Sequence, residues 1–155
     1  MGTAHSLANS TEINRSVFEP IRYDYADFEV DVADSFNWQG IFEELKECSQ
    51  TIENKIALFV FRSIRRANVD DKILKQLDDA ALLSAESAEG FIHYEPFEGL
   101  SYCLWQTPED ARAAICSPEH VSAARYAEQA YEDCYLVSGW LLQSPIDGRV
   151  ELIKS

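Results

Sequence analysis

Residues 56–61 read Ile-Ala-Leu-Phe-Val-Phe, a run of six apolar side chains without a polar interruption. Successive side chains of a β-strand point to opposite faces of its sheet, so a strand made from this run is apolar on both faces. The run is much too short to cross a membrane as a helix, which needs about 20 apolar residues. The sequence therefore predicts a buried strand in a sheet that must be covered on both sides.

Several further segments follow this strand in an order that indicates one fold. Capping residues and apolar residues at 3–4 spacing predict helices, and short apolar runs separated by Pro and Gly predict strands. The resulting order is β-α-β-β-α-β, which is typical of the α+β ferredoxin-like sandwich. The predicted elements are a helix over 70–87, a hairpin of strands over 91–95 and 100–105, helices starting at Thr107-Pro108 and Ser117-Pro118, the second running to about 133, and a strand over 135–142.

The two helices of this order cover only one face of the sheet. A second copy of the same sheet is the natural cover for the other face, because the first strand is apolar on both sides. We therefore predict a homodimer in which two sandwiches form a dimeric α+β barrel, with an extra N-terminal arm.

Residue composition divides the chain into four parts. The first part is rich in Ser, Asn and Thr, and the second alternates acidic with aromatic residues before a short helix over 34–45. The alternation is consistent with an edge strand or with an extended arm that lies on another surface. The parts are a loosely ordered N-terminus (1–18), the acidic aromatic arm (19–54), the ferredoxin-like domain (55–143) and a C-terminal tail (144–155).

The charge of the chain excludes some classes of partner. The chain has 27 acidic and 13 basic side chains, a net charge of −14, and the first 55 residues carry half of it, with 11 acids and 4 bases. Nucleic-acid binders need a basic face, and anionic membranes attract basic segments, so we expect neither partner. The first eight residues have neither the basic nor the apolar region of a secretory signal, so we expect a cytoplasmic protein.

Known cofactor and metal motifs are missing from the sequence. There is no Gly-rich phosphate loop, nucleophile elbow or HExxH motif, so we predict no cofactor. The four cysteines form no CxxC pair and no zinc ribbon, so we expect reduced thiols packed as small apolar groups. Cys116 is the most plausible reactive thiol because it precedes a helix start.

His120 is the first candidate for chemistry. It lies near the start of the second long helix and begins a stripe that continues through Ala123 or Ala124, Ala127 and Cys134, so we expect it to face the sheet. The helix N-terminus and partial burial both disfavour a charged imidazole, and a neutral imidazole is suited to act as a general base. Three roles stay open: an acid/base, a ligand contact without chemistry, and a hydrogen bond to a nearby backbone group.

The other candidates lie on the predicted strands. His93 and Glu95 share a strand face and could form an acid/base pair or two metal ligands, but no third ligand stands at a recognisable spacing, so we predict no metal. Trp105 is either a core residue or a wall against an aromatic substrate. Tyr94 and Tyr102 lie on the opposite faces of their strands from His93 and Trp105, and either hydroxyl could reach a cavity. Buried Arg62 needs a partner, either Glu95 or an anionic substrate.

The segments Trp105-Gln106-Thr107-Pro108-Glu109-Asp110 and Ser117-Pro118-Glu119-His120-Val121 resemble the dimeric α+β barrel superfamily. Its members include antibiotic-biosynthesis monooxygenase-like domains and stress-responsive A/B barrel domains. The Pro-x-His pattern is similar to the helix start of plant olivetolic acid cyclase, and the catalytic His of that motif falls on His120. The Tyr that the cyclase uses falls on Ala114. The residues of the haem-degrading branch fall on Phe61, Ala114 and Ala124, so haem degradation is not expected.

This resemblance implies a small cofactor-independent enzyme that acts on an aromatic or polyketide-like metabolite in an apolar pocket between helices and sheet. The reaction is left open among cyclisation, dehydration or isomerisation, and oxygenation. The predicted catalytic residues are His120, His93 and Tyr102, and the predicted substrate-binding residues are Trp105, Arg62, Tyr94, Glu95 and Ala124. The alternative is a non-catalytic protein of the same fold that binds a small molecule or a partner.

Overall fold

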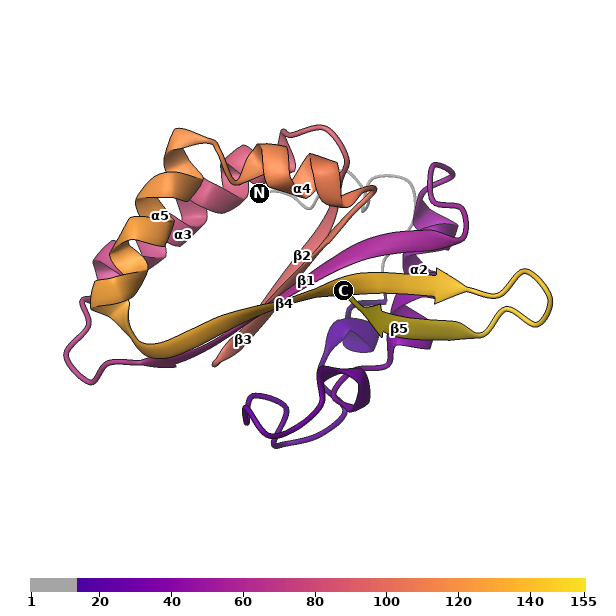
Figure 1. The fold of residues 1–155 in the computed structure, drawn as a ribbon, viewed down its shortest axis with the longest axis horizontal. Helices are drawn as coiled ribbons and strands as arrows, with labels where there is room; N and C mark the ends of the chain where they lie inside the picture. The colour runs from indigo at the N-terminus through magenta and orange to yellow at the C-terminus, as the bar shows by residue number, and fades with distance from the viewer. Residues whose placement is uncertain (1–13) are drawn as a thin grey trace.

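A computed structural model describes residues 14–155 and shows a ferredoxin-like α+β sandwich with one additional strand (Figure 1). The sheet has five strands in the order β2-β3-β1-β4-β5, and every neighbouring pair is antiparallel. The predicted β-α-β-β-α-β order is confirmed. Its elements are β1 (Lys55–Arg65), α3 (Asp71–Glu86), β2 (Phe91–Phe97), β3 (Leu100–Trp105), α4 (Pro108–Ala114), α5 (Pro118–Ala130) and β4 (Tyr131–Gln143).

The helices begin where the capping residues predict. Asp70 accepts hydrogen bonds from the first backbone N–H groups of α3, and Thr107 and Ser117 do the same for α4 and α5. Helix α5 ends at Ala130, three residues before the predicted end, and β4 starts at once with Tyr131. The reason is long-range pairing: the N-terminal half of β4 pairs with the C-terminal half of β1, beyond the reach of local sequence signals.

The predicted C-terminal tail is partly a strand. Residues Val150–Lys154 form β5, which pairs with Gly139–Gln143 of β4 after a turn that contains Gly148 with φ +75°. Val150 and Leu152 pack against the core, and this packing stabilises a strand only five residues long. Gln39 accepts a hydrogen bond from the Val150 N–H at 2.8 Å, which occupies one of the backbone groups on the outer edge of the sheet.

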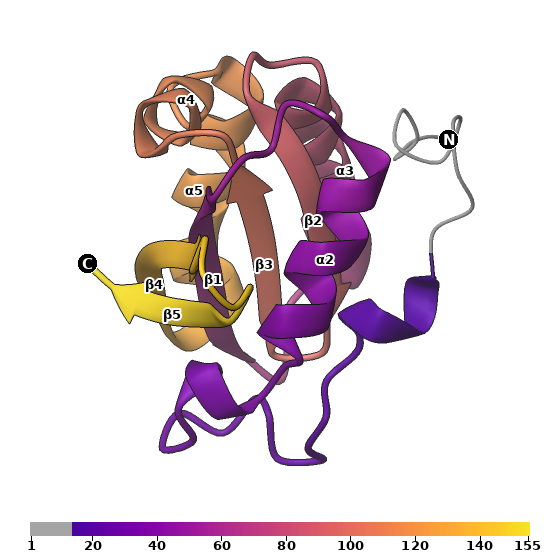
Figure 2. The same cartoon turned by 90° about the vertical axis from the view of Figure 1, so that its right-hand side faces the viewer.

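The N-terminal segment is folded against the sheet (Figure 2). It contains two 3₁₀ turns, η1 (Arg15–Phe18) and η2 (Val32–Asp34), followed by α2 (Trp38–Cys48). The helix agrees with the predicted short helix, but the segment before it makes only the isolated bridge Pro20–Phe36 and no regular strand. Residues 14–18, predicted to be loosely ordered, form a turn whose Phe18 is fully buried, whereas residues 1–13 lie outside the described part.

The two covers of the sheet differ in origin. Figure 1 shows α3, α4 and α5 on one side and the N-terminal segment with α2 on the other. Ile56, Leu58 and Val60 of β1 pack in the cluster that includes this segment, and Ala57 and Phe59 point to the helices. The chain's own residues 15–52 therefore cover the face that we assigned to a second copy. This face therefore needs no second copy to cover it, and the homodimer stays a prediction.

Phe18 provides a test of this intramolecular cover. Its side chain is fully buried and its ring lies 4.3 Å from the ring of His93, so Phe18→Ala removes a large contact between segment and sheet. We expect the free energy of unfolding in urea to fall by about 3–5 kcal/mol. Tyr23→Ala is the matched control, because Tyr23 is 97% exposed and its loss should cost less than about 0.5 kcal/mol. Equal effects of the two substitutions would contradict the cover that we describe.

Candidate functional site

The sheet separates the predicted site residues into two groups. The residues that we predicted as catalytic, His120, His93 and Tyr102, therefore do not meet at one site. The sequence shows which residues share a strand face but not which layer covers that face, so this separation could not be predicted. One group, on the face covered by the N-terminal segment, is His93, Glu95, Tyr102 and Arg62. The other group, on the side of the sheet that carries α3, α4 and α5, which we call the helix side, is Tyr94, Trp105, His120 and Ala124.

His93 and Glu95 form a buried pair beneath the N-terminal segment. His93 Nε2 and Glu95 Oε2 are 2.6 Å apart, which confirms that the two residues share a face. The Phe18 ring stacks on His93, and Arg15 reaches Glu95 with a 3.1 Å ion pair. Both members of the pair are less than 10% exposed, so this pair fastens the N-terminal segment to β2 and has no access for a substrate.

Tyr102 serves the same attachment. Its hydroxyl donates a 2.9 Å hydrogen bond to the backbone oxygen of Phe18, and burial raises the pKa of the phenol. A buried phenol with a raised pKa and a backbone acceptor is a structural donor. The proposed catalytic use of Tyr102 finds no support in this geometry.

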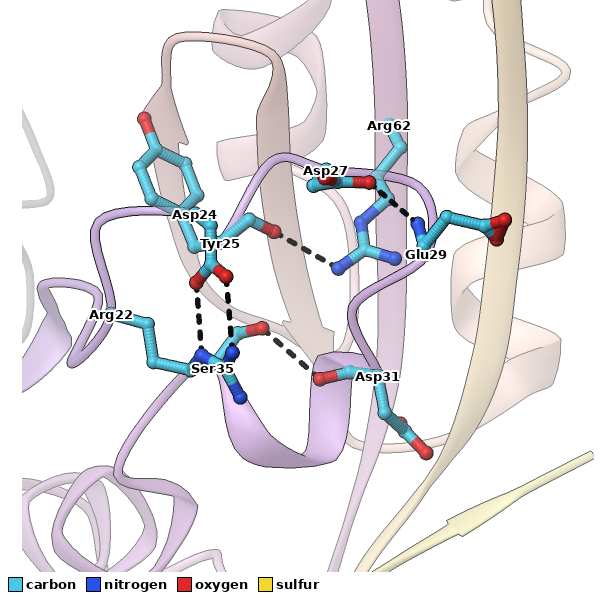
Figure 3. A network of polar contacts seen from close by, with 8 residues as sticks. All are labelled: Arg22, Asp24, Tyr25, Asp27, Glu29, Asp31, Ser35 and Arg62. Atoms are coloured by element: carbon cyan, nitrogen blue, oxygen red, sulfur yellow. Dashed lines mark hydrogen bonds and ion pairs between the residues drawn. The ribbon is translucent and has the colours of Figure 1, made fainter.

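Arg62 lies under the acidic loop of the N-terminal segment (Figure 3). Its guanidinium donates to the backbone oxygen of Tyr25 at 2.9 Å and to the Tyr135 hydroxyl at 2.8 Å. Its Nε is buried without a hydrogen-bond partner among the described residues. Glu95, the partner that we considered, pairs with Arg15 instead. The acids that follow in the loop, Asp27 and Asp31 among them, place negative charge near this buried cation.

Two predicted residues of the helix side are mainly part of the packing. The Trp105 indole donates to Cys103 Sγ at 3.3 Å, meets Phe91 edge to face, and packs with Ala57 and Ala111. Tyr94 is half-buried, and burial raises the pKa of its phenol to about 12. Both residues lie beneath the helices of this side.

His120 lies in the first turn of α5 and is half-buried. Burial lowers its pKa below 6.5, although a hydrogen bond to its own backbone acts in the opposite direction. The imidazole is therefore neutral at pH 7, as we predicted from its position. Its neighbours Ala123 and Ala127 are half-buried, but Ala124, which we predicted to bind substrate, is exposed. The sequence left Ala123 and Ala124 as alternatives, and the helix orientation selects Ala123.

Three aromatic residues on the helix side escaped the sequence analysis as site residues. Phe59, Phe61 and Trp140 lie in the middle of the sheet beneath the helices, yet all three are only half-buried. Phe59 and Trp140 lie in a cluster with alanines of α3 and α4, namely Ala85, Ala111 and Ala114, and alanine side chains are too short to cover large rings fully. Leu136, on the same face of β4, is 61% exposed. The alternation of β1 places these rings on one face, but their incomplete cover depends on how the helices pack.

Other kinds of site are poorly supported in the described part of the chain. It contains no group of three or more His, Cys, Asp or Glu side chains that could hold a metal ion. Between residues 14 and 155, no helix is both long and apolar enough to span a membrane. A groove of about 480 Å³ lies between η2, the first turn of α2 and β5, and none of the predicted site residues lines it.

All four cysteines are free thiols, but the packing that we predicted for them is only partly correct. Cys116 and Cys134 are exposed, while Cys48 and Cys103 are at least partly covered. Burial raises the pKa of the Cys103 thiol to about 11, so this thiol is protonated at pH 7.

The strand order and the two-sided cover define a ferredoxin-like α+β protein. The family model described as PB2B2.08-like matches residues 5–153, and the chain belongs to that family. The family match includes the N-terminal segment, for which the sequence analysis named no counterpart. No curated protein matches this sequence significantly.

Several solved structures are similar to part of the chain. A dimeric ferredoxin-like protein of unknown function from Thermobifida fusca has 12% identity and a TM-score of 0.45, covering 56% of this chain and 92% of its own. SnoaB, a cofactor-independent oxygenase from Streptomyces nogalater, has 9% identity and a TM-score of 0.42, covering 63% and 100%. Rv0793 from Mycobacterium tuberculosis has 13% identity and a TM-score of 0.45, covering 60% and 96%.

Proposed function

We propose that this protein is a small cofactor-independent enzyme that binds an aromatic or polyketide-like metabolite on the helix side of the sheet. The observation that carries the proposal is the incomplete cover of Phe59, Phe61 and Trp140, of which Phe59 and Trp140 lie in a cluster with alanines of α3 and α4. Small-molecule sites are mostly apolar and carry only a few polar groups. Burying the half-exposed part of these rings against a flat apolar ligand would stabilise the complex.

His120 is the acid/base of the proposed enzyme. Its imidazole is neutral at pH 7 because burial lowers its pKa, and a neutral imidazole accepts a proton from a substrate C–H or O–H group. Cyclisation, dehydration or isomerisation, and oxygenation of such substrates can each begin with this proton removal. His93 and Tyr102 are not part of this site, because they lie on the other side of the sheet.

A non-catalytic protein that binds a small molecule or a partner is the second candidate, and one observation favours it. Apart from its own backbone, no described residue hydrogen-bonds the His120 ring. Acid/base histidines are normally oriented by a carboxylate or carbonyl partner on the second ring nitrogen. The two candidates share the binding surface and differ only in whether His120 transfers a proton.

Calorimetric titration with 1-naphthol, a neutral flat aromatic, tests the binding surface. We expect one ligand per chain, and we expect Ala114→Leu to weaken binding by about tenfold or more, because Ala114 lies in the cluster with Phe59 and Trp140 and the larger side chain fills space above the rings. Ala113→Leu makes the same change one residue earlier on an exposed position and should leave the affinity within about twofold. If the unmodified protein does not bind 1-naphthol, the proposed site is wrong.

Ring opening of 5-nitrobenzisoxazole tests His120 as a base. Removal of the ring C–H proton breaks the N–O bond and releases a coloured nitrophenolate, so no other reactant is needed. We expect a rate that rises with pH and is half-maximal below pH 6.5, because burial lowers the pKa of His120 and only the neutral imidazole is a base. His120→Gln should lower the plateau rate by about tenfold or more.

Glu119→Gln is the control for this experiment, because it removes an adjacent carboxylate in the same helical turn. Its rate should match that of the unmodified protein. If His120→Gln reacts as fast as the unmodified protein while both still bind 1-naphthol, the enzyme proposal fails and the binding candidate stands.

The predicted homodimer needs a surface other than the sheet face beneath the N-terminal segment. That face is filled by residues such as Phe18, Phe42 and Leu45, which are fully buried within one chain. Light scattering of the full chain distinguishes a mass of 17.6 kDa from twice that value. We expect the dimeric mass; a monomer across the micromolar range would remove the homodimer from the proposal.

A further inference from the structure

Lys55 stands at the open side of the proposed site. It is the first residue of β1, and its Nζ lies 4.8 Å from the ring centroid of Trp140. Trp140 packs with Ala57 and Trp105 on the helix side, so the ammonium group is held on that same side. The face of an indole attracts a cation, and this contact fixes the position of an otherwise flexible side chain.

Lys55 has no carboxylate partner within ion-pair distance among the described residues. Six of the 13 basic side chains do form such pairs, namely Arg15, Arg22, Arg65, Lys75, Arg112 and Lys154. Among the described residues, Lys55 is the basic side chain that lies over an aromatic ring, and it is exposed at the edge of an apolar surface. Its charge is available to an anion from solvent.

Strand register shows what surrounds this cation. Lys55 is paired with Leu142, and Leu142 with Glu151, so Glu151 is the acid in the same row. Two strand spacings, about 10 Å, separate the backbones of Lys55 and Glu151, and their side chains form no ion pair among the described residues. Between them, Leu142 is 38% exposed, and Ile153 in the next row is 43% exposed. An apolar, solvent-accessible strip thus leads past the ammonium group to Trp140.

We propose that Lys55 selects anionic ligands for the site, so that the molecule it binds is an aromatic carboxylate or an enolate of similar shape. This inference rests on the proposed function, because it assigns a ligand class to the same surface. The ring of the ligand lies against the apolar strip and the half-buried aromatics, and its anionic group pairs with Lys55 Nζ. The charge pair supplies the selectivity, and the apolar contact supplies most of the affinity.

A comparison of 1-naphthoate with 1-naphthol tests the charge preference, because the two ligands share one ring system. We expect the unmodified protein to bind 1-naphthoate at least as tightly as 1-naphthol, despite the repulsion from the net charge. Lys55→Gln should weaken the binding of 1-naphthoate by about fivefold, which is the effect of one charge contact near water, and should leave the affinity for 1-naphthol unchanged. Lys55→Arg should retain the binding of 1-naphthoate.

Lys72→Gln is the matched control, because Lys72 is an exposed lysine at the start of α3, near the opposite end of β1. It should change neither affinity. If Lys55→Gln leaves 1-naphthoate binding unchanged, or weakens both ligands equally, the charge-selection proposal is wrong while the binding site stands. If the unmodified protein binds 1-naphthol but rejects 1-naphthoate, the proposal is also wrong. Binding of neither ligand would overturn the proposed function itself.

Discussion

The central strand β1 is apolar on both faces, and the rest of the structure depends on covering both. An exposed apolar sheet face would cost about 25 cal/mol for each Å² left in water. The ferredoxin-like order of elements supplies two helices for one face only. The N-terminal segment supplies the other cover within the same chain, through Phe18, Ile41 and Phe42, which are fully buried.

The two covers are built from different side chains, and this difference directs function to one side. Beneath the N-terminal segment, aromatic and aliphatic groups fill the interface, and the buried Tyr102 hydroxyl donates to the Phe18 carbonyl. On the other side, alanines of α3 and α4 cluster with large rings, which remain half-buried. An incompletely covered aromatic face gains stability when a ligand covers it.

The charged side chains are also distributed unevenly over the structure. Half of the net charge belongs to the first 55 residues, and one of those acids, Asp31, ties the N-terminal segment to the sheet. Asp31 pairs with Lys154 of β5 at 2.8 Å, and the loop around it lies over buried Arg62. This ion pair helps to hold the cover on the sheet. At the opposite end of β1, Lys55 keeps its charge free of carboxylates in the described chain.

The sequence by itself determined the order of the elements, the helix starts at Asp70, Thr107 and Ser117, and the pairing of His93 with Glu95 on one face. These features depend on local chemistry: capping groups, apolar periodicity and strand alternation. It also placed His120 at a helix start, where burial lowers the pKa of the imidazole. The short strand β5 and the early start of β4 were missed, because distant backbone partners decide them.

Only the tertiary structure decided what covers each face of the sheet. The sequence shows that Phe18 and Phe42 are apolar, but not that they occupy the place expected for a second subunit. That choice separated His93 and Tyr102 from His120, left Ala124 exposed while Ala123 is half-buried, and left Phe59 and Trp140 only half-buried. Such outcomes depend on contacts between residues far apart in the chain, and periodicity along one segment carries no information about them.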